Sequence, residues 1–232
     1  MPVNKILLLP GMDGTGKLLL DFSHALPKQM RRVIPIYLAD RFLSYADLAG
    51  LVRSFCEDSE PFVLMAESFS TPLAIQVAAE RPKNLKALIL CAGFAESPVR
   101  GPARWLGWVL APVLMRIPLL DSTIRSRLVG EDATEELMAA GRKAIASVQP
   151  HVLAGRLRAA LTCDVRSTLE RINVPILYLQ AQHDRLVGSR CFAQIQRLRP
   201  DIQTRVIDGP HFLLQRYPEE AARIVTEFIG SL

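Results

Sequence analysis

The feature that most constrains this chain is the alternation of short, almost wholly apolar runs with longer amphipathic stretches. The runs are nearly continuous in Val, Ile and Leu, as in strands that are covered on both sides. Such runs separated by helical stretches are typical of βαβ units, in which the strands are parallel. Six strands are predicted, at Lys5–Leu9, Val33–Leu38, Phe62–Ala66, Leu88–Cys91, Val174–Gln180 and Thr204–Ile207.

The amphipathic stretches are predicted to be helices that cover this sheet. They lie at Lys17–Pro27, Tyr45–Cys56, Thr71–Glu80, Arg190–Leu198 and Pro218–Phe228. The fold class that follows is α/β, with a mostly parallel central sheet of about six strands and helices on both faces.

Residues 97–164 break this alternation, because their sequence contains no clear strand and predicts helices. Within 97–130, five arginines accompany a single acidic residue, Asp121. We expect this segment to be a helical cap, or lid, inserted over the carboxyl edge of the sheet. Residues 1–96 and 165–232 are then expected to form one α/β core.

Length and composition agree with one domain that carries an inserted element. The chain has 232 residues, of which 50% are hydrophobic and 22% charged, so a sizeable core is expected and general disorder is excluded. The net charge of +5 permits weak attraction to anionic surfaces. However, the basic residues form no long run and no motif that reads nucleic acid, so no nucleic-acid partner is expected.

The four cysteines are far apart, with no CxxC pair and no His at metal-ligand spacing. They are interpreted as free thiols in a reducing compartment, and no metal or organic cofactor is expected. The longest apolar stretch, Trp105–Met115, is shorter than the roughly 20 residues that span a membrane. The apolar run Ile6–Leu9 is too short for a signal peptide. A soluble, cytoplasmic protein is predicted.

Ser68 lies between a predicted strand and a predicted helix, in the run Ala66-Glu67-Ser68-Phe69-Ser70. A serine on such a sharp turn is lifted out of the sheet, where its hydroxyl can meet a reacting carbonyl. The turn requires small residues two positions before and after the serine, and here these are Ala66 and Ser70. The alternative is a helix N-cap, in which Ser68 or Ser70 accepts backbone N–H bonds.

Asp184 and His211 each follow a later predicted strand. Taken separately, Asp184 could simply cap the next helix and His211 could be solvated. Together with Ser68 they give the order Ser, Asp, His, each just beyond the carboxyl end of a parallel strand, where open α/β sheets build their sites. We predict a triad in which His211 takes the proton of Ser68 and Asp184 orients His211. Asp208 is the competing candidate for the acid.

A tetrahedral intermediate also requires hydrogen-bond donors for its oxyanion. Fixed backbone N–H groups suit this purpose because they reorganise little during the reaction. The N–H of Phe69, directly after the nucleophile, is one candidate. The other is the N–H of Met12 in the run Pro10-Gly11-Met12-Asp13-Gly14 (Pro10–Gly14, the glycine loop), where glycine allows close approach of a substrate.

On these motifs the chain resembles the α/β-hydrolase superfamily over essentially all of its residues, and within it the small single-domain esterases with a helical cap. The resemblance implies a nucleophile elbow at Ser68 and an oxyanion hole after the first strand. The chain departs from the usual pattern in two places: Pro10-Gly11 replaces His-Gly, and Ala66 and Ser70 replace the glycines around the serine. The run Pro10–Gly16 is also similar to acyl-ester synthases and esterases of the chloroplast lipid type.

A nucleotide-binding loop is the rival interpretation of residues Gly11–Lys17. The run follows a strand, opens a helix and nearly spells a phosphate-binding loop, with Lys17 at the position that reaches phosphates. Leu18, however, stands where a Ser or Thr hydroxyl would hold Mg²⁺. As a dinucleotide fingerprint, the run lacks its third glycine.

Trp105, Trp108 and Leu114 belong to a dense apolar concentration within the predicted cap. One interpretation is a helix packed on the core. The other is the lining of an acyl pocket, which favours a hydrophobic acyl substrate. Arg100, Arg104 and Arg116 at its ends could meet a carboxylate, lipid phosphates or an acidic carrier protein.

The function predicted from the sequence is a serine esterase or thioesterase that forms an acyl-enzyme on Ser68. Its partner is a small-molecule ester or thioester, with an acyl carrier or a lipid surface as a further partner. An acyltransferase with the same acyl-enzyme is the first alternative, and a repurposed hydrolase fold without activity is another. Activity is expected to fall as His211 becomes protonated at acidic pH. The oligomeric state is left open.

Overall fold

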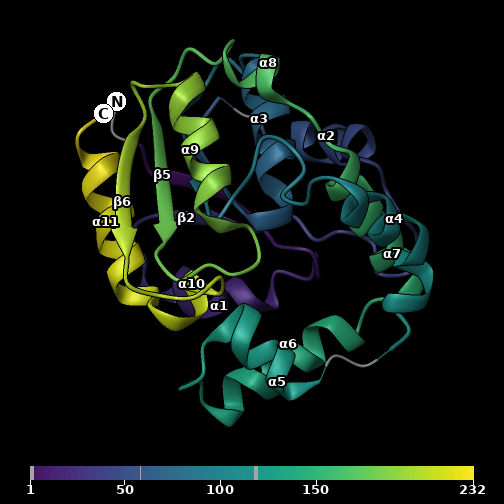
Figure 1. Cartoon of the computed structure of the whole chain (residues 1–232). Coiled ribbons are helices and arrows are strands. Elements are labelled where there is room, and N and C mark those ends of the chain that lie inside the picture. The colour runs from purple at the N-terminus through teal and green to yellow at the C-terminus, as the bar shows by residue number, and fades with distance from the viewer. Residues whose placement is uncertain (1–2, 58, 118–119) are drawn as a thin grey trace.

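The computed structural model describes residues 3–57, 59–117 and 120–232 (Figure 1). Its strands form one six-stranded sheet in the order β2-β1-β3-β4-β5-β6, and every neighbouring pair is parallel. The predicted α/β class with a central parallel sheet is therefore confirmed. The strands are β1 (Lys5–Leu9), β2 (Arg31–Val33), β3 (Phe62–Glu67), β4 (Leu85–Cys91), β5 (Ile176–Ala181) and β6 (Gln203–Ile207).

The prediction of a strand at Val33–Leu38 was wrong, because β2 ends where that strand was expected to begin. After Val33 the chain leaves the edge of the sheet and passes over the glycine loop, which follows β1. There the backbone N–H of Tyr37 donates to the carbonyl of Gly14 at 2.8 Å. A Cβ at Gly16 would lie 2.5 Å from Ile34, so the glycine permits this close crossing. Of the apolar side chains after Val33, Tyr37 is buried and Ile34 packs against the core, whereas Ile36 and Leu38 are exposed.

Helices cover the sheet on both faces, as its two-sided burial requires. On one face α2, α3, α8 and α9 pack on alternate strand residues such as Leu64, and on the other α1 and α11 pack on the intervening residues such as Val63. Figure 1 shows α9 and α11 on opposite sides of β5 and β6. The bounds are α1 (Leu20–Ala25), α2 (Tyr45–Ser54), α3 (Thr71–Ala79), α8 (Arg166–Leu169), α9 (Gly188–Leu198), α10 (Leu213–Arg216) and α11 (Pro218–Gly230).

Local sequence explains where several of these helices begin. Ser44 and Asp47 exchange hydrogen bonds in a capping box that begins α2. Pro72 and Pro218 lie in the first turns of α3 and α11, where proline costs no helical hydrogen bond. The predicted helix at Lys17–Pro27 is shorter in the structure, with a 3₁₀ turn (Lys17–Leu19) that leads into α1.

Residues 97–164, here called the helical segment, leave the core after β4 and return to it before α8. An isolated antiparallel bridge between Glu96 and Asp164 joins the two ends of the segment. In Figure 1, α5 and α6 lie beyond the arrowheads of the strands, and α4 and α7 lie beside each other at one side. The segment contains α4 (Pro102–Leu114), α5 (Asp121–Ile124), a π-helical turn (Arg125–Val129), α6 (Glu135–Ala146) and α7 (Pro150–Thr162).

No helix in the described part of the chain combines the length and the apolar character that crossing a bilayer requires. The four cysteines form no disulfide among the described residues.

Candidate active site

Ser68 lies at a sharp turn between β3 and α3, half-buried at the carboxyl edge of the sheet. Its φ is +49°, in the left-handed region that non-glycine residues avoid. A residue held there stores strain, of the kind that is found at functional sites. The N-cap alternative does not describe the turn, because neither Ser68 nor Ser70 accepts a capping bond from the helix.

Ser70 occupies the position where the resemblance to α/β hydrolases leads one to expect glycine, and its hydroxyl forms two hydrogen bonds. It donates to the carbonyl oxygen of Pro10, and Tyr37 donates to Ser70 Oγ at 2.7 Å. The residue is fully buried, so these bonds tie the serine turn to the glycine loop. The departure from the usual motif thus couples two parts of the site.

The structure brings Ser68, His211 and Asp184 together, although 143 residues separate the first two. Nε2 of His211 lies 2.9 Å from Ser68 Oγ, and Nδ1 lies 2.7 Å from Oδ2 of Asp184. With Nδ1–H donating to the carboxylate, Nε2 is free to accept the serine proton. The order and the distances are those of a nucleophile, a base and an orienting acid.

Asp184 is held in its ionised form by its surroundings. Burial alone would raise its pKa, but the neighbouring His211 and hydrogen bonds to the carboxylate lower the pKa below its ordinary value. Besides His211, the backbone N–H groups of Leu186 and Val187 donate to Oδ1 at 2.8 Å. The carboxylate therefore fixes its own loop through one oxygen and faces the imidazole with the other.

Asp208, the competing acid, does not face His211. Its Oδ1 lies 2.7 Å from Nε2 of His183, and both side chains are exposed. His151 contacts the carbonyl of Asp40 instead of the serine. Of the two candidate acids, only Asp184 contacts His211.

The glycine loop is held by its carbonyl groups, all five of which accept a hydrogen bond. The loop turns tightly, with Gly14 N–H donating to Gly11 O at 3.1 Å. The donors for residues 10 to 14 are, in order, Ser70 Oγ, Gly14 N, Arg156 Nη1, Arg156 Nη1 and Tyr37 N. A loop with every carbonyl fixed has its N–H directions fixed as well, because each peptide unit is planar.

Met12 and Phe69, the predicted oxyanion donors, lie in segments that this network joins. The N–H of Met12 donates to no atom of the described residues, and Phe69 lies in the first helical turn after Ser68, where N–H groups lack intrahelical partners. The Phe69 carbonyl accepts from Tyr45 Oη at 2.9 Å, which fixes that residue.

Glu67 is a residue that sequence reasoning missed. Its carboxyl group is buried directly before the serine, accepts from Gln215 Nε2 at 2.9 Å and lies against Gly11. Burial raises its pKa to about 7, against the opposing effects of the Gln215 hydrogen bond and of His211, while Asp13 adds to the rise. The signal in the sequence is an acidic residue at the end of an otherwise apolar, two-sided strand.

Arg156 was missed as well. It projects from α7 and donates to the carbonyls of Met12 and Asp13, both at 2.8 Å. The sequence offers no signal for this contact, since 144 residues separate Arg156 from Met12.

The predicted substrate-binding side chains do not join this cluster. Trp105, Trp108 and Leu114 are 66%, 37% and 41% exposed, and only Ala111 is buried in α4. The two indole rings meet edge to face at 6.4 Å, and Arg158 lies over Trp108. The apolar face of α4 is thus largely open to solvent.

The loop does not favour phosphate binding. Asp13 accepts from the backbone N–H and the hydroxyl of Thr15, so its carboxylate occupies an amide that a phosphate would use. Glu67 adds a second carboxyl group beside Gly11. Among the described residues, no group of three or more His, Cys, Asp and Glu side chains is arranged to hold a metal ion.

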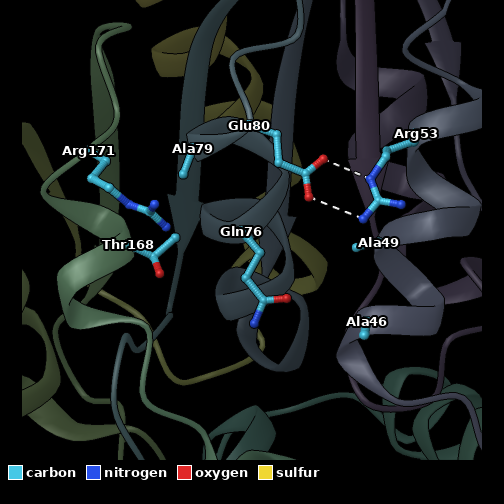
Figure 2. Close-up of a pocket in the computed structure, with 8 residues that line it drawn as sticks. All are labelled: Ala46, Ala49, Arg53, Gln76, Ala79, Glu80, Thr168 and Arg171. Carbon is cyan, nitrogen blue, oxygen red and sulfur yellow. Dashed lines mark hydrogen bonds and ion pairs between the residues drawn. The ribbon is translucent and has the colours of Figure 1, made fainter.

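A groove of about 520 Å³ lies between α2, α3 and α8, on a helical face of the sheet. Figure 2 shows the side chains that line it. Across it, Arg53 and Glu80 form a two-pronged ion pair at 2.7 and 3.1 Å. None of the predicted site residues lines this groove. Its lining residues are Ala46, Ala49, Arg53, Gln76, Ala79, Glu80, Thr168 and Arg171.

Comparison with known proteins connects this geometry to a family and to solved folds. The family model described as serine aminopeptidase, S33, matches residues 36–213. No curated protein matches the chain.

Among solved structures, the enol-lactonase from Burkholderia xenovorans is similar with a TM-score of 0.83 and 16% identity, over 99% of this chain and 92% of that chain. A bromoperoxidase from Bacillus anthracis is similar with a TM-score of 0.81 and 14% identity, over 98% of this chain and 92% of that chain. A lipase-esterase related protein from Clostridium acetobutylicum is similar with a TM-score of 0.79 and 15% identity, over 97% of this chain and 94% of that chain. At these identities the likeness shows the fold alone.

Proposed function

Since the chain belongs to the serine aminopeptidase S33 family of α/β hydrolases, we propose that it cleaves a carboxylic ester or thioester through an acyl-enzyme on Ser68. The observation that carries the proposal is the continuous set of hydrogen bonds from Ser68 through His211 to Asp184. A serine hydroxyl is a weak nucleophile by itself, and it is activated by an adjacent base that a third group orients.

The proposed reaction proceeds in two halves. Ser68 Oγ attacks the substrate carbonyl while its proton passes to His211 Nε2, and the imidazolium so formed is stabilised by Asp184. His211 then gives that proton to the leaving alcohol or thiol as the acyl–oxygen or acyl–sulfur bond breaks. In the second half, water attacks the acyl-enzyme by the same route and regenerates Ser68. Transfer to another nucleophile in place of water would make the protein an acyltransferase.

The oxyanion that forms in each half is proposed to accept from the N–H groups of Met12 and Phe69. Removal of one such donor typically lowers kcat by roughly 10²–10³. The fixed carbonyls of the glycine loop support this role, because a loop that is already ordered loses little entropy when the transition state forms.

We further propose that the helical segment acts as a cap and that the substrate carries a hydrophobic acyl group. The apolar face of α4, with Trp105, Trp108 and Leu114, is the surface available to such a group. The same face, between Arg100 and Arg116, has the chemistry of a helix that lies on an anionic lipid surface. An acidic acyl carrier is the alternative partner for it.

Labelling with a fluorophosphonate probe tests the activated nucleophile. The wild-type protein is expected to react at Ser68, mapped by mass spectrometry, and the Ser68→Ala and His211→Ala variants are expected not to react. A panel of acetyl to decanoyl esters, matching thioesters and an aminoacyl anilide then separates esterase, thioesterase and peptidase activity. Labelling of Ser68→Ala at the wild-type rate would overturn the proposal.

Asp184 and Asp208 provide a matched pair for the acid. Asp184→Asn is expected to lower kcat by about 10⁴, as loss of the orienting acid does in serine hydrolases of this type. Asp208→Asn removes a similar charge from an exposed carboxylate nearby and is expected to leave kcat unchanged. The reverse result would assign the acid to Asp208.

A further inference from the structure

Arg156 is a charged side chain in the interior of the protein, only 2% exposed, in the middle of α7. Its guanidinium donates to three carbonyl oxygens: Nη1 to those of Met12 and Asp13 at 2.8 Å, and Nη2 to that of Leu38 at 2.9 Å. It forms no ion pair within the described residues. A buried charge is costly unless its donors are satisfied, and here main-chain oxygens of the site satisfy them.

In the glycine loop, Arg156 holds the two peptide units that follow the Met12 amide, and a turn within the loop holds the unit that contains it. Gly11 O is held by Gly14 N–H, and Met12 O is held by Arg156. Because a trans peptide unit is planar, the carbonyl direction of Gly11 sets the N–H direction of Met12. With the next two carbonyls also fixed by Arg156, the loop cannot rotate that N–H away without breaking several hydrogen bonds.

The helix that carries Arg156 is itself fixed to residues 39–42, in the loop between β2 and α2. The N–H of Gln149 donates to Ala39 O at 2.8 Å, and His151 Nε2 lies 3.1 Å from Asp40 O. Phe42 packs so closely on Gly155 that a Cβ there would lie 2.5 Å from its ring. The helix and the glycine loop therefore form one connected body.

We propose that Arg156 is the positioning residue of the oxyanion hole, holding the Met12 N–H toward the reacting carbonyl from a helix of the segment that covers the sheet. The proposal rests on the proposed function, since it assigns the Met12 amide to the oxyanion. The planar, forked guanidinium reaches three oxygens at once, whereas a lysine would present a single ammonium group.

Kinetics of Arg156→Met and Arg156→Lys test this role. Both variants are expected to lower kcat for ester hydrolysis by about 10- to 100-fold, Met more than Lys, with KM within twofold and an unchanged pH midpoint. A trifluoromethyl ketone, which forms an oxyanion on Ser68, is expected to bind more weakly by the same factor. A kcat within twofold of wild type in both variants, or a shifted pH midpoint, would overturn the proposal.

Arg199→Met is the matched control, since Arg199 also donates to main-chain carbonyls, those of Leu169 and Ile172, but lies away from the site. It is expected to lose stability without loss of kcat. If Arg156→Met does not fold, as judged by circular dichroism, Arg156→Lys carries the test.

Hydrogen exchange of peptides covering residues 10–16 gives a readout that needs no activity. Exchange is expected to be faster in the Arg156 variants and unchanged in Arg199→Met, and unchanged exchange in the Arg156 variants would overturn the positioning role. If the wild-type protein turns over no ester or thioester, the proposed function fails by itself, and the exchange result still decides whether Arg156 fixes the loop.

Discussion

Ser68, the proposed nucleophile, has a strained backbone, and this strain can be measured separately from any catalytic role. At a φ of +49°, a residue with a Cβ is less stable than glycine by about 1 kcal/mol. Ser68→Gly is therefore expected to be more stable than Ser68→Ala by about that amount, as measured by urea denaturation. Both variants lack the hydroxyl and its bond to His211, so their difference isolates the backbone. Equal stabilities would show that the turn is unstrained.

Glu67 makes the stability of the protein depend on pH near neutrality. Its pKa in the folded protein is about 7, above the ordinary value of a glutamate, because burial disfavours the charged form. Between about pH 4.5 and 7, the carboxyl group of Glu67 is therefore protonated in the folded protein but ionised in the unfolded chain. It follows that the contribution of Glu67 to the free energy of unfolding is fully present below about pH 4.5 and is lost as the pH rises through 7.

Glu67→Gln removes this titration and keeps an oxygen that can accept from Gln215. The variant is expected to gain stability relative to wild type as the pH rises, by about 2 kcal/mol between pH 5 and pH 8. Urea denaturation of both proteins at the two pH values measures this change. A stability difference that does not vary with pH would contradict the assigned titration.

At the scale of elements, replacement of glycine by alanine is expected to have opposite effects on stability at two positions inside helices of the helical segment. Alanine normally stabilises a helix relative to glycine by up to about 1 kcal/mol. A Cβ at Gly141 in α6 would meet only Phe212, at an ordinary contact distance of 3.6 Å, whereas a Cβ at Gly155 in α7 would overlap the ring of Phe42.

Gly141→Ala is therefore expected to raise the free energy of unfolding by up to about 1 kcal/mol, and Gly155→Ala to lower it by about 1–3 kcal/mol. Thermal and urea denaturation of the two variants provide the comparison. Adding Phe42→Leu to Gly155→Ala is expected to restore part of the loss. Stabilisation by Gly155→Ala alone would mean that α7 is not packed against Phe42 in solution.

At the scale of the whole molecule, basic residues accompany the exposed apolar face of α4, within the helix and next to its ends. Residues 97–120 contain three arginines and no acidic residue, in a chain with a net charge of +5. Both tryptophans of the protein, Trp105 and Trp108, lie on α4, so intrinsic tryptophan fluorescence reports on this helix alone.

Anionic phospholipid vesicles are expected to shift the tryptophan emission to shorter wavelengths, and zwitterionic vesicles to do so much less, since each basic residue near an anionic surface contributes about 1 kcal/mol. Val109→Glu with Val113→Glu, on the exposed face, is expected to abolish the shift. Val206→Glu, at an exposed position of β6, is the control and is expected to preserve it. Absence of any shift in the wild-type protein would leave α4 without a lipid partner.

The sequence by itself determined the α/β class, five of the six strands to within a few residues, and the edge at which the candidate site lies. This was possible because burial on both sides of a strand leaves a local apolar run, and because the carboxyl ends of parallel strands share one edge. Ser68, Asp184 and His211 could be assigned to that edge from their positions after strands. Their catalytic roles stay predictions.

Only the tertiary structure decided which side chains meet at that edge. It distinguished Asp184 from Asp208, ended β2 at Val33, and brought Arg156 to the carbonyl of a residue 144 positions earlier. It also left the apolar face of α4 open. Local periodicity records whether a residue is buried, but not what it is buried against, because contacts between distant segments depend on how the completed layers pack.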